Sequence, residues 1–224
     1  MFRNRMNVTG ENRLAIAAHY EMGASHFCMK QTGFLCALLW LVLAGSSVFG
    51  FSTVVIDAGH GGSDRGGSPG QRIAEKPYTL DIARRLASAL HSRGIRTVMT
   101  RSGDYFVGLD QRCAIANAQS NAIFVSIHLN SAPRSDANGI ETYFYTGHSA
   151  PLASALHSAV VRAAGTQNRG VRRRAFFVVR HTRIPAVLCE CGFLTNPAEA
   201  ARIQSGWHRQ RIANAIASAI AAHR

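Results

Sequence analysis

Apolar residues recur at two different spacings along the chain after residue 50, and the two kinds of segment largely alternate. Short runs of β-branched and other apolar residues predict strands, and apolar residues that return every three or four positions predict helices. The predicted strands are 53–57, 95–100, 122–128, 140–145, 175–179 and 186–191. The predicted helices are 76–92, 109–118, 151–164, a short helix that begins at Asn196-Pro197, and 207–222.

This alternation predicts the fold class α/β. We expect a three-layer sandwich, with a largely parallel mixed sheet of about six strands and helices on both faces. The run 122–128 is continuously apolar, as in a strand covered on both sides. Ligands of such sheets bind beyond the carboxyl ends of the strands. His60, His128 and Glu190 lie at or near predicted strand ends and are therefore candidate site residues.

The first fifty residues have a different pattern. An apolar run of eleven residues, 34–44, follows Lys30 and precedes the small-residue stretch 45–50. The run is short for a membrane span, and the pattern is typical of a secretory signal. An uncleaved membrane anchor or a buried core helix is the alternative. We therefore divide the chain into an extension with a signal peptide (1–50), in which Met29 is a possible true start, and one domain (51–224).

Composition and charge limit the classes of molecule that this domain is expected to bind. The chain has 224 residues, of which 47% are apolar and 17% charged, enough to bury a core. After residue 50 there are 21 Lys and Arg and 10 Asp and Glu, a net charge of +11. An exported cationic protein meets anionic envelope polymers, in the periplasm or in the extracellular cell wall. No helix-turn-helix, RRM or zinc-finger signature is present, so we expect no nucleic acid partner.

Three residues stand out as candidate metal ligands. His60 lies among Gly59, Gly61 and Gly62, His128 ends a predicted strand, and Glu75 directly precedes a predicted helix. Each has an ordinary structural interpretation: a satisfied histidine, or a carboxylate favoured by the helix dipole. Their spacing forms no local zinc motif such as H-E-x-x-H, so spacing alone is weak evidence.

Glu190 carries a stronger signal. It lies within the apolar segment PAVLCECGFL (185–194), where a carboxylate costs several kcal/mol unless it is paired, bound to a metal or protonated. A functional role for Glu190 is the interpretation that this pattern favours.

Several motifs, taken in order, now carry a resemblance. They are VVIDAGHGG (54–62) followed by Asp64 and Gly66-Gly67, then Glu75-Lys76, SIHLNS (126–131), GIETY (139–143) and PAVLCECGFLTNP (185–197). Together they resemble the zinc-dependent N-acetylmuramoyl-L-alanine amidases of the Amidase_3 family. The ordered set runs through nearly the whole of residues 53–222.

The resemblance implies a site and a reaction. It implies that His60, Glu75 and His128 bind one Zn²⁺ and that Glu190 is the catalytic carboxylate, with a fourth zinc position open to water. The implied reaction is hydrolysis of the peptidoglycan amide between N-acetylmuramic acid and L-alanine. Two alternatives remain: another zinc peptidase that acts on the stem peptide, or a wall-binding module without catalysis.

Other polar residues keep two interpretations each. Glu141 faces the site or is structural, Asn130 lines the site or caps a loop, and Asp57 orients a ligand imidazole or supports the turn. The run Arg172-Arg173-Arg174 is a solvated charge run or contacts carboxylates of the stem peptide.

Two features depart from the pattern that we expect in the family. Cys189 and Cys191 flank Glu190, and strand alternation points both away from it, so we interpret them as core thiols. Only residues 146–150 separate the fourth predicted strand from the next helix. This leaves no room for the inhibitory helical insertion that regulated amidases of this kind carry, so we predict activity without an obligatory activator protein.

Overall fold

The structure, a computed structural model, describes residues 50–68 and 71–224. The predicted signal segment and the possible start at Met29 lie outside the described residues, so these predictions stay untested. Among the described helices, none combines the length and the apolar character that a membrane crossing requires.

The described residues form six strands and a set of helices. The strands are β1 (Thr53–Ala58), β2 (Arg96–Met99), β3 (Ala122–Asn130), β4 (Ile140–Phe144), β5 (Asn168–Arg173) and β6 (Ala186–Phe193). The helices are α2 (Lys76–His91), α3 (Leu109–Asn117), the 3₁₀ turn η1 (Gly147–Ser149), α4 (Ala150–Ala164), α5 (Phe177–His181), α6 (Pro197–Gln204) and α7 (Gly206–His223).

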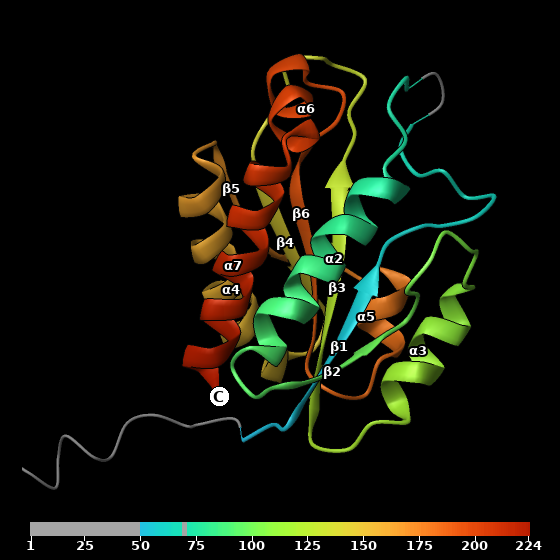
Figure 1. The fold of residues 1–224 in the computed structure, drawn as a ribbon, viewed down its shortest axis with the longest axis vertical. Coiled ribbons are helices and arrows are strands. Elements are labelled where there is room, and N and C mark those ends of the chain that lie inside the picture. The colour runs from blue at the N-terminus through green and yellow to red at the C-terminus, as the bar shows by residue number, and fades with distance from the viewer. Residues whose placement is uncertain (1–49, 69–70) are drawn as a thin grey trace, which may run out of the picture. The chain divides into compact units, whose positions relative to one another are not determined.

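The strands form one mixed sheet in the order β2-β1-β3-β6-β4-β5 (Figure 1). Strands β2, β1, β3 and β6 are parallel to one another, whereas β4 pairs with β6 in the antiparallel direction and β5 is parallel to β4. The carboxyl ends of β1, β3 and β6 therefore meet the amino ends of β4 and β5 at one edge of the molecule. This arrangement decides which side chains can share a site.

Alternate residues of the central strands pack into two separate cores, one on each face of the sheet. In β3, Ile123, Val125 and Ile127 pack with residues of α2, α4, α6 and α7, while Phe124 packs with residues of α3 and α5. Helices thus cover both faces of the sheet, as the ribbon shows (Figure 1). The predicted three-layer α/β sandwich is confirmed.

One predicted element is wrong. We expected a strand at 175–179, but Phe177–His181 is the short helix α5, and the strand at the sheet edge is Asn168–Arg173. Strand β5 has only one apolar side chain, Val171, because edge strands face solvent widely, so its sequence lacks a strand signal. A short apolar run such as Phe176 to Val179 does not by itself distinguish a strand from a buried helix turn. Here it buries Val178 and Val179 against the sheet.

Helix α6 begins with a cap that also ties two loops together. The side chain of Asn196 accepts a hydrogen bond from the Glu199 backbone N–H (3.1 Å). The buried Glu199 carboxylate accepts the backbone N–H groups of Phe193 (2.7 Å) and Gly139 (3.0 Å). Glu199 therefore links the end of β6 to the residue that precedes β4.

Replacing Glu199 by alanine leaves two buried backbone N–H groups without an acceptor. We expect Glu199→Ala to lower the free energy of unfolding by about 3 kcal/mol. Asn196→Ala removes the cap alone and should cost about 1 kcal/mol. Urea unfolding measures both, and an Asn196→Ala cost equal to or greater than that of Glu199→Ala would contradict this role.

Candidate active site

The turn after β1 positions His60 in an unusual backbone conformation. His60 has φ 62°, in the left-handed region that non-glycine residues seldom adopt. Two arginines that are almost inaccessible to solvent, Arg101 and Arg112, hold this turn by its carbonyl groups. Arg101 donates through Nε to Ala58 O (2.9 Å) and through Nη2 to Gly59 O (2.8 Å).

Arg112, which projects from α3, binds the same turn, and we call Arg101 and Arg112 together the arginine clamp. Its Nη2 donates to the carbonyl of His60 (2.8 Å), and its Nη1 donates to Asp57 Oδ1 (2.7 Å). Burial alone would raise the pKa of Asp57, but the charge of Arg112 and hydrogen bonds from Ser126 and Thr100 hold it below its ordinary value. Asp57 therefore supports the turn through Arg112. Of the two roles that the sequence allowed for Asp57, the structure favours this one over orienting a ligand imidazole.

The Glu75 carboxylate lies between the two histidines. Its Oε2 is 3.0 Å from His60 Nε2, and its Oε1 is 3.0 Å from His128 Nδ1. Oε1 also accepts the backbone N–H of Leu129 (2.8 Å), which fixes the buried carboxylate against β3. One potential ligand atom from each of the three residues lies within 4.8 Å of the others.

Two glycines make this close approach possible. A Cβ atom at Gly59 would lie 2.4–2.7 Å from the ring of His128. A Cβ atom at Gly66, where φ is 71°, would lie 2.6 Å from Glu75 Cβ and 2.7 Å from His60 Cδ2. The glycines of the motif thus leave space for the two imidazoles, beyond allowing a tight turn.

Asp64 orients one imidazole, and sequence reasoning did not assign it this role. Its Oδ2 is 2.8 Å from His60 Nδ1, while its Oδ1 accepts the backbone N–H of Gly66 (3.0 Å). This contact directs the opposite ring nitrogen, Nε2, toward Glu75. A carboxylate four residues after a candidate ligand histidine, in the same glycine-rich loop, is the signal that could have indicated it.

The electrostatics of the cluster favour a bound cation. Burial opposes ionisation of Glu75, yet hydrogen bonds from His128 and His60 hold the pKa of its carboxyl well below the usual range. Burial also disfavours the charged imidazoles, but the Glu75 carboxylate raises the pKa of His60, and raises that of His128 to about 9. Two imidazoles and one ionised carboxylate in contact are a donor set that fits Zn²⁺.

Glu190 lies next to this cluster on the same face of the sheet. Its Cα is the register partner of His128 on the neighbouring strand β3. Glu190 Oε2 is buried without a hydrogen-bond partner among the described residues. Burial, aided by the negative charge of Glu75, raises the pKa of Glu190 to about 7 although the charge of His128 opposes the shift. Such a carboxyl exchanges protons near neutral pH.

A second carboxylate, Glu141, faces the same side from β4. Glu141 is the register partner of Glu190, because the antiparallel direction of β4 brings its first residues beside the end of β6. Its carboxylate accepts hydrogen bonds from Tyr143 Oη (2.8 Å), Asn130 Nδ2 (2.7 Å) and Arg169 Nε (3.1 Å). Glu141 is thus a paired neighbour of the site, whereas Glu190 Oε2 has no hydrogen-bond partner among the described residues.

The cysteines stay apart from this site. Cys189 and Cys191 are buried free thiols, and both belong to the core on the opposite face of the sheet from Glu190. Within residues 50–68 and 71–224, only His60, Glu75 and His128 form a group of three or more potential metal-ligand side chains.

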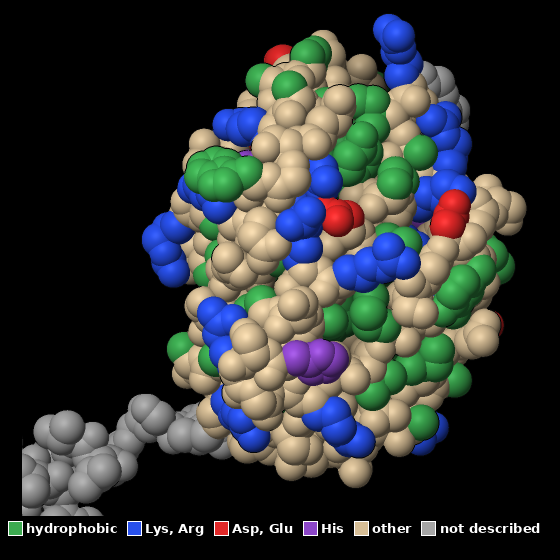
Figure 2. Space-filling model, viewed as in Figure 1, with side chains coloured by type: hydrophobic (Ala, Val, Ile, Leu, Met, Phe, Trp, Pro, Cys, Tyr) green, Lys and Arg blue, Asp and Glu red, His purple; other side chains and the backbone are tan. Residues whose placement is uncertain are grey.

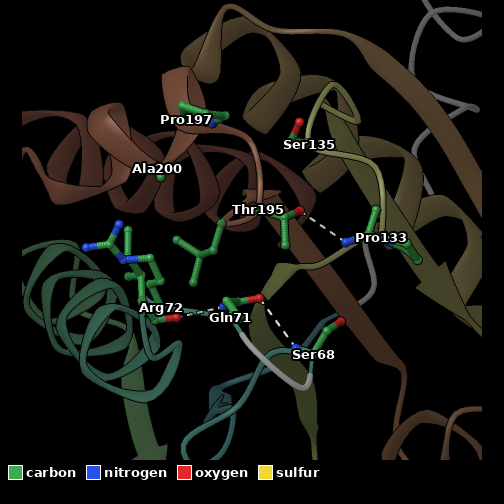
Figure 3. Close-up of a pocket in the computed structure, with 11 residues that line it drawn as sticks. Ser68, Gln71, Arg72, Pro133, Ser135, Thr195, Pro197 and Ala200 are labelled. Carbon is green, nitrogen blue, oxygen red and sulfur yellow. Dashed lines mark hydrogen bonds between the residues drawn. The ribbon is translucent and has the colours of Figure 1, made fainter.

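The described residues also form a pocket of about 430 Å³. It is bounded by the loop before α2, the loop after β3, and the segment between β6 and α6, which contribute Gln71, Pro133 and Thr195 (Figure 3). None of the four predicted site residues lines it. The structure thus brings together all four of those residues outside this pocket, and their chemical roles remain a prediction.

Comparisons with known proteins agree on one family. A family model described as N-acetylmuramoyl-L-alanine amidase matches residues 54–222. LytH of Staphylococcus epidermidis, named a probable cell wall amidase, is 41% identical over 166 residues, which are 73% of this chain and 55% of that protein.

Two solved structures are similar over most of the domain. The catalytic domain of CwlV, an N-acetylmuramoyl-L-alanine amidase from Bacillus (Paenibacillus) polymyxa, superposes with a TM-score of 0.73 and 38% identity, over 77% of this chain and 97% of that one. The CwlD amidase of Clostridioides difficile, solved in complex with the GerS lipoprotein, gives a TM-score of 0.72 and 29% identity, over 77% and 98%.

The fold and these matches define an amidase catalytic domain. The chain belongs to the Amidase_3 family of N-acetylmuramoyl-L-alanine amidases, the enzymes that hydrolyse the amide linking glycan to peptide in peptidoglycan. The matched region spans about half the length of LytH.

The clamp predicts a large stability effect at Arg112. We expect Arg112→Met to lower the free energy of unfolding by about 3–5 kcal/mol, because it leaves Asp57 buried and unpaired. Arg84 also donates to a backbone carbonyl but is exposed, so Arg84→Met should change stability by less than about 0.5 kcal/mol. Equal effects in chemical denaturation would contradict the clamp.

The raised pKa of Glu190 predicts that the free energy of unfolding depends on pH when a chelator is present. Its folded-state pKa is raised, so the wild-type protein loses stability as the pH rises through about 7. Glutamine does not ionise, and the stability gained by Glu190→Gln should therefore grow between pH 5 and pH 8. The pKa of Glu141 is lowered although burial opposes this, so Glu141→Gln should be destabilising at both pH values. A Glu190→Gln effect that is independent of pH would refute this assignment.

Proposed function

We propose that the domain uses one Zn²⁺, held by His60, Glu75 and His128, to hydrolyse the amide between N-acetylmuramic acid and L-alanine in peptidoglycan. One observation carries the proposal: a preformed His, Glu, His cluster lies one strand away from a carboxylate oxygen, Glu190 Oε2, that lacks a hydrogen-bond partner within residues 50–68 and 71–224. A structural core has no use for an unpaired buried carboxyl at this position.

The residues fit the metal on grounds of chemistry and space. Glycines at 59 and 66 admit the two rings, and Asp64 fixes the orientation of His60. When bound, zinc makes water more acidic and polarises the scissile carbonyl. The chain would supply three side chains for this ion, the number of protein ligands that catalytic zinc sites use.

Glu190 performs the proton transfers of the reaction. With a pKa of about 7, its carboxylate accepts a proton from the attacking water. The protonated carboxyl then delivers this proton to the nitrogen of the departing L-alanine. A carboxyl with an ordinary pKa would be a poor donor to that amine at neutral pH.

The surrounding residues keep these groups aligned. The arginine clamp fixes the backbone of His60, and Leu129 N–H fixes Glu75. Glu141 and Glu190 lie side by side on neighbouring strands, so the charge of Glu141 helps to keep the pKa of Glu190 above its ordinary value. Preorganised partners of this kind remove the cost of reorienting the site during the reaction.

The predicted signal segment and the basic surface support a substrate in the cell wall. We propose that the protein acts outside the cytoplasm, in the periplasm or the cell wall, and that anionic envelope polymers attract it. Lys and Arg side chains clearly outnumber acidic ones on the face shown in Figure 2, in agreement with the net charge of +11 after residue 50.

The domain should act without an activator protein. Only Tyr145 and Thr146 separate β4 from the turn η1, after which α4 begins at Ala150, so this connection holds no added helix. The structure of the CwlD amidase contains a lipoprotein partner, which makes a direct test of this proposal necessary.

The reaction is tested by mass spectrometry of the products after incubation of the purified protein alone with peptidoglycan. We expect free peptides with an L-alanine amino terminus. A chelator should abolish them until zinc is restored, and Glu190→Gln should reduce the rate about 10²–10⁴-fold. Asp110→Asn, an exposed control on α3, should keep full activity.

Other products would identify another function. Cleavage within the stem would indicate a zinc peptidase, and no cleavage with zinc bound would indicate a wall-binding module. Cleavage that begins only after a second protein is added would contradict independence from an activator.

A further inference from the structure

The active face continues beyond Glu190 toward the sheet edge. Register partners connect His128 on β3 with Glu190 on β6, and Glu190 with Glu141 on β4. In the same register, Tyr143 of β4 pairs with Arg172 of the edge strand β5. Glu141 and Tyr143 are two residues apart and so face the same side. Arg172 therefore lies on the face that carries Glu190.

The three consecutive arginines 172–174 have different surroundings. Arg172 Nη1 is 3.6 Å from Glu141 Oε1. Arg173 Nε donates to Tyr145 O (2.8 Å), and its guanidinium lies over the Tyr145 ring. Arg174 is exposed and bonds through its backbone N–H to Phe144 O (2.9 Å). Only Arg172 of this run is placed against the active-site network.

Glu141 leaves Arg172 with hydrogen-bonding capacity. The Glu141 carboxylate already accepts bonds from Tyr143, Asn130 and Arg169, and Arg172 stands beyond hydrogen-bond distance from it. Arg172 Nη2 donates to Arg169 O (3.1 Å), and its side chain is 44% exposed. Two guanidiniums thus share one carboxylate, and one side of Arg172 is open to an additional anion.

The distance from Glu190 to Arg172 matches the length of a short extended peptide. Neighbouring strands are about 4.8 Å apart, and Arg172 Nη1 lies 3.6 Å from the carboxylate of Glu141, the register partner of Glu190, so the guanidinium is about 5–10 Å from Glu190. An extended peptide advances about 3.5 Å per residue. A stem peptide whose scissile amide lies at Glu190, and which crosses the strands toward β5, therefore brings its second or third residue to Arg172.

We propose that Arg172 binds a carboxylate of the stem peptide at its second or third residue, and that Glu141 and Arg169 hold the guanidinium in place. The proposal rests on the proposed function. It makes Arg172 a specificity-determining residue for peptides that carry a free carboxylate beyond L-alanine.

The test compares two forms of one peptidoglycan preparation. In one form the carboxylates of the stem peptides are free, and in the other they are converted to carboxamides with ammonia and a carbodiimide. Rates of L-alanine amine release are measured at physiological ionic strength, which screens long-range attraction to the wall. We expect the wild-type protein to prefer the free form about tenfold.

Matched variants separate a local site from general charge. Arg172→Gln should bring this ratio near one, and Arg172→Lys should retain part of it. Arg174→Gln removes the same charge from an exposed neighbour and should keep the wild-type ratio. Thermal unfolding of each variant verifies that it is folded.

Three results would overturn the proposal. They are a wild-type ratio near one, an unchanged ratio in Arg172→Gln, and an equal loss of preference in Arg174→Gln and Arg172→Gln. Failure of the wild-type protein to release L-alanine amines from either form would instead refute the proposed function, and the carboxylate site with it.

Discussion

Two buried guanidiniums hold the turn on which the whole site depends. His60 occupies a left-handed backbone conformation, and the carbonyls of Ala58, Gly59 and His60 accept bonds from Arg101 and Arg112. Strain of this kind persists only where the surroundings fix it. Because Arg112 also pairs with the buried Asp57, the clamp joins β1 to α3 and sets the position of His60 relative to β3.

The charged groups of the site lie next to the turn that the clamp holds. Glu75 lies between His60 and His128, and on the strand next to that of His128 the Oε2 atom of Glu190 has no hydrogen-bond partner in the described part of the chain. The first arrangement attracts a cation, and the second keeps a carboxyl poised near neutral pH. The site thus brings together two carboxyls, Glu75 and Glu190, whose pKa values shift in opposite directions, which is how one fold separates a ligand from an acid–base group.

Much of this arrangement could be predicted from the sequence, and the remainder has physical reasons. The strand periodicity predicted the sandwich, and Glu190 stood out because a carboxylate in an apolar strand is costly. Strand β5 was not predicted, because a polar edge strand lacks that periodicity. The role of Arg101 was not predicted, because this side chain binds backbone carbonyls and has no carboxylate partner, and a pattern of side chains does not reveal such contacts. The place of Glu141 depends on the antiparallel direction of β4, which only the structure gives.

The central claim is that His60, Glu75 and His128 form one zinc site, and zinc-edge X-ray absorption of the protein loaded with one equivalent of Zn²⁺ tests it most directly. We predict a first coordination shell of nitrogen and oxygen only, at about 2.0–2.2 Å, including two imidazoles that decrease to one in His128→Ala. A sulfur scatterer at about 2.3 Å would place the metal at the cysteines and contradict the account. A spectrum unchanged by His128→Ala would contradict it equally.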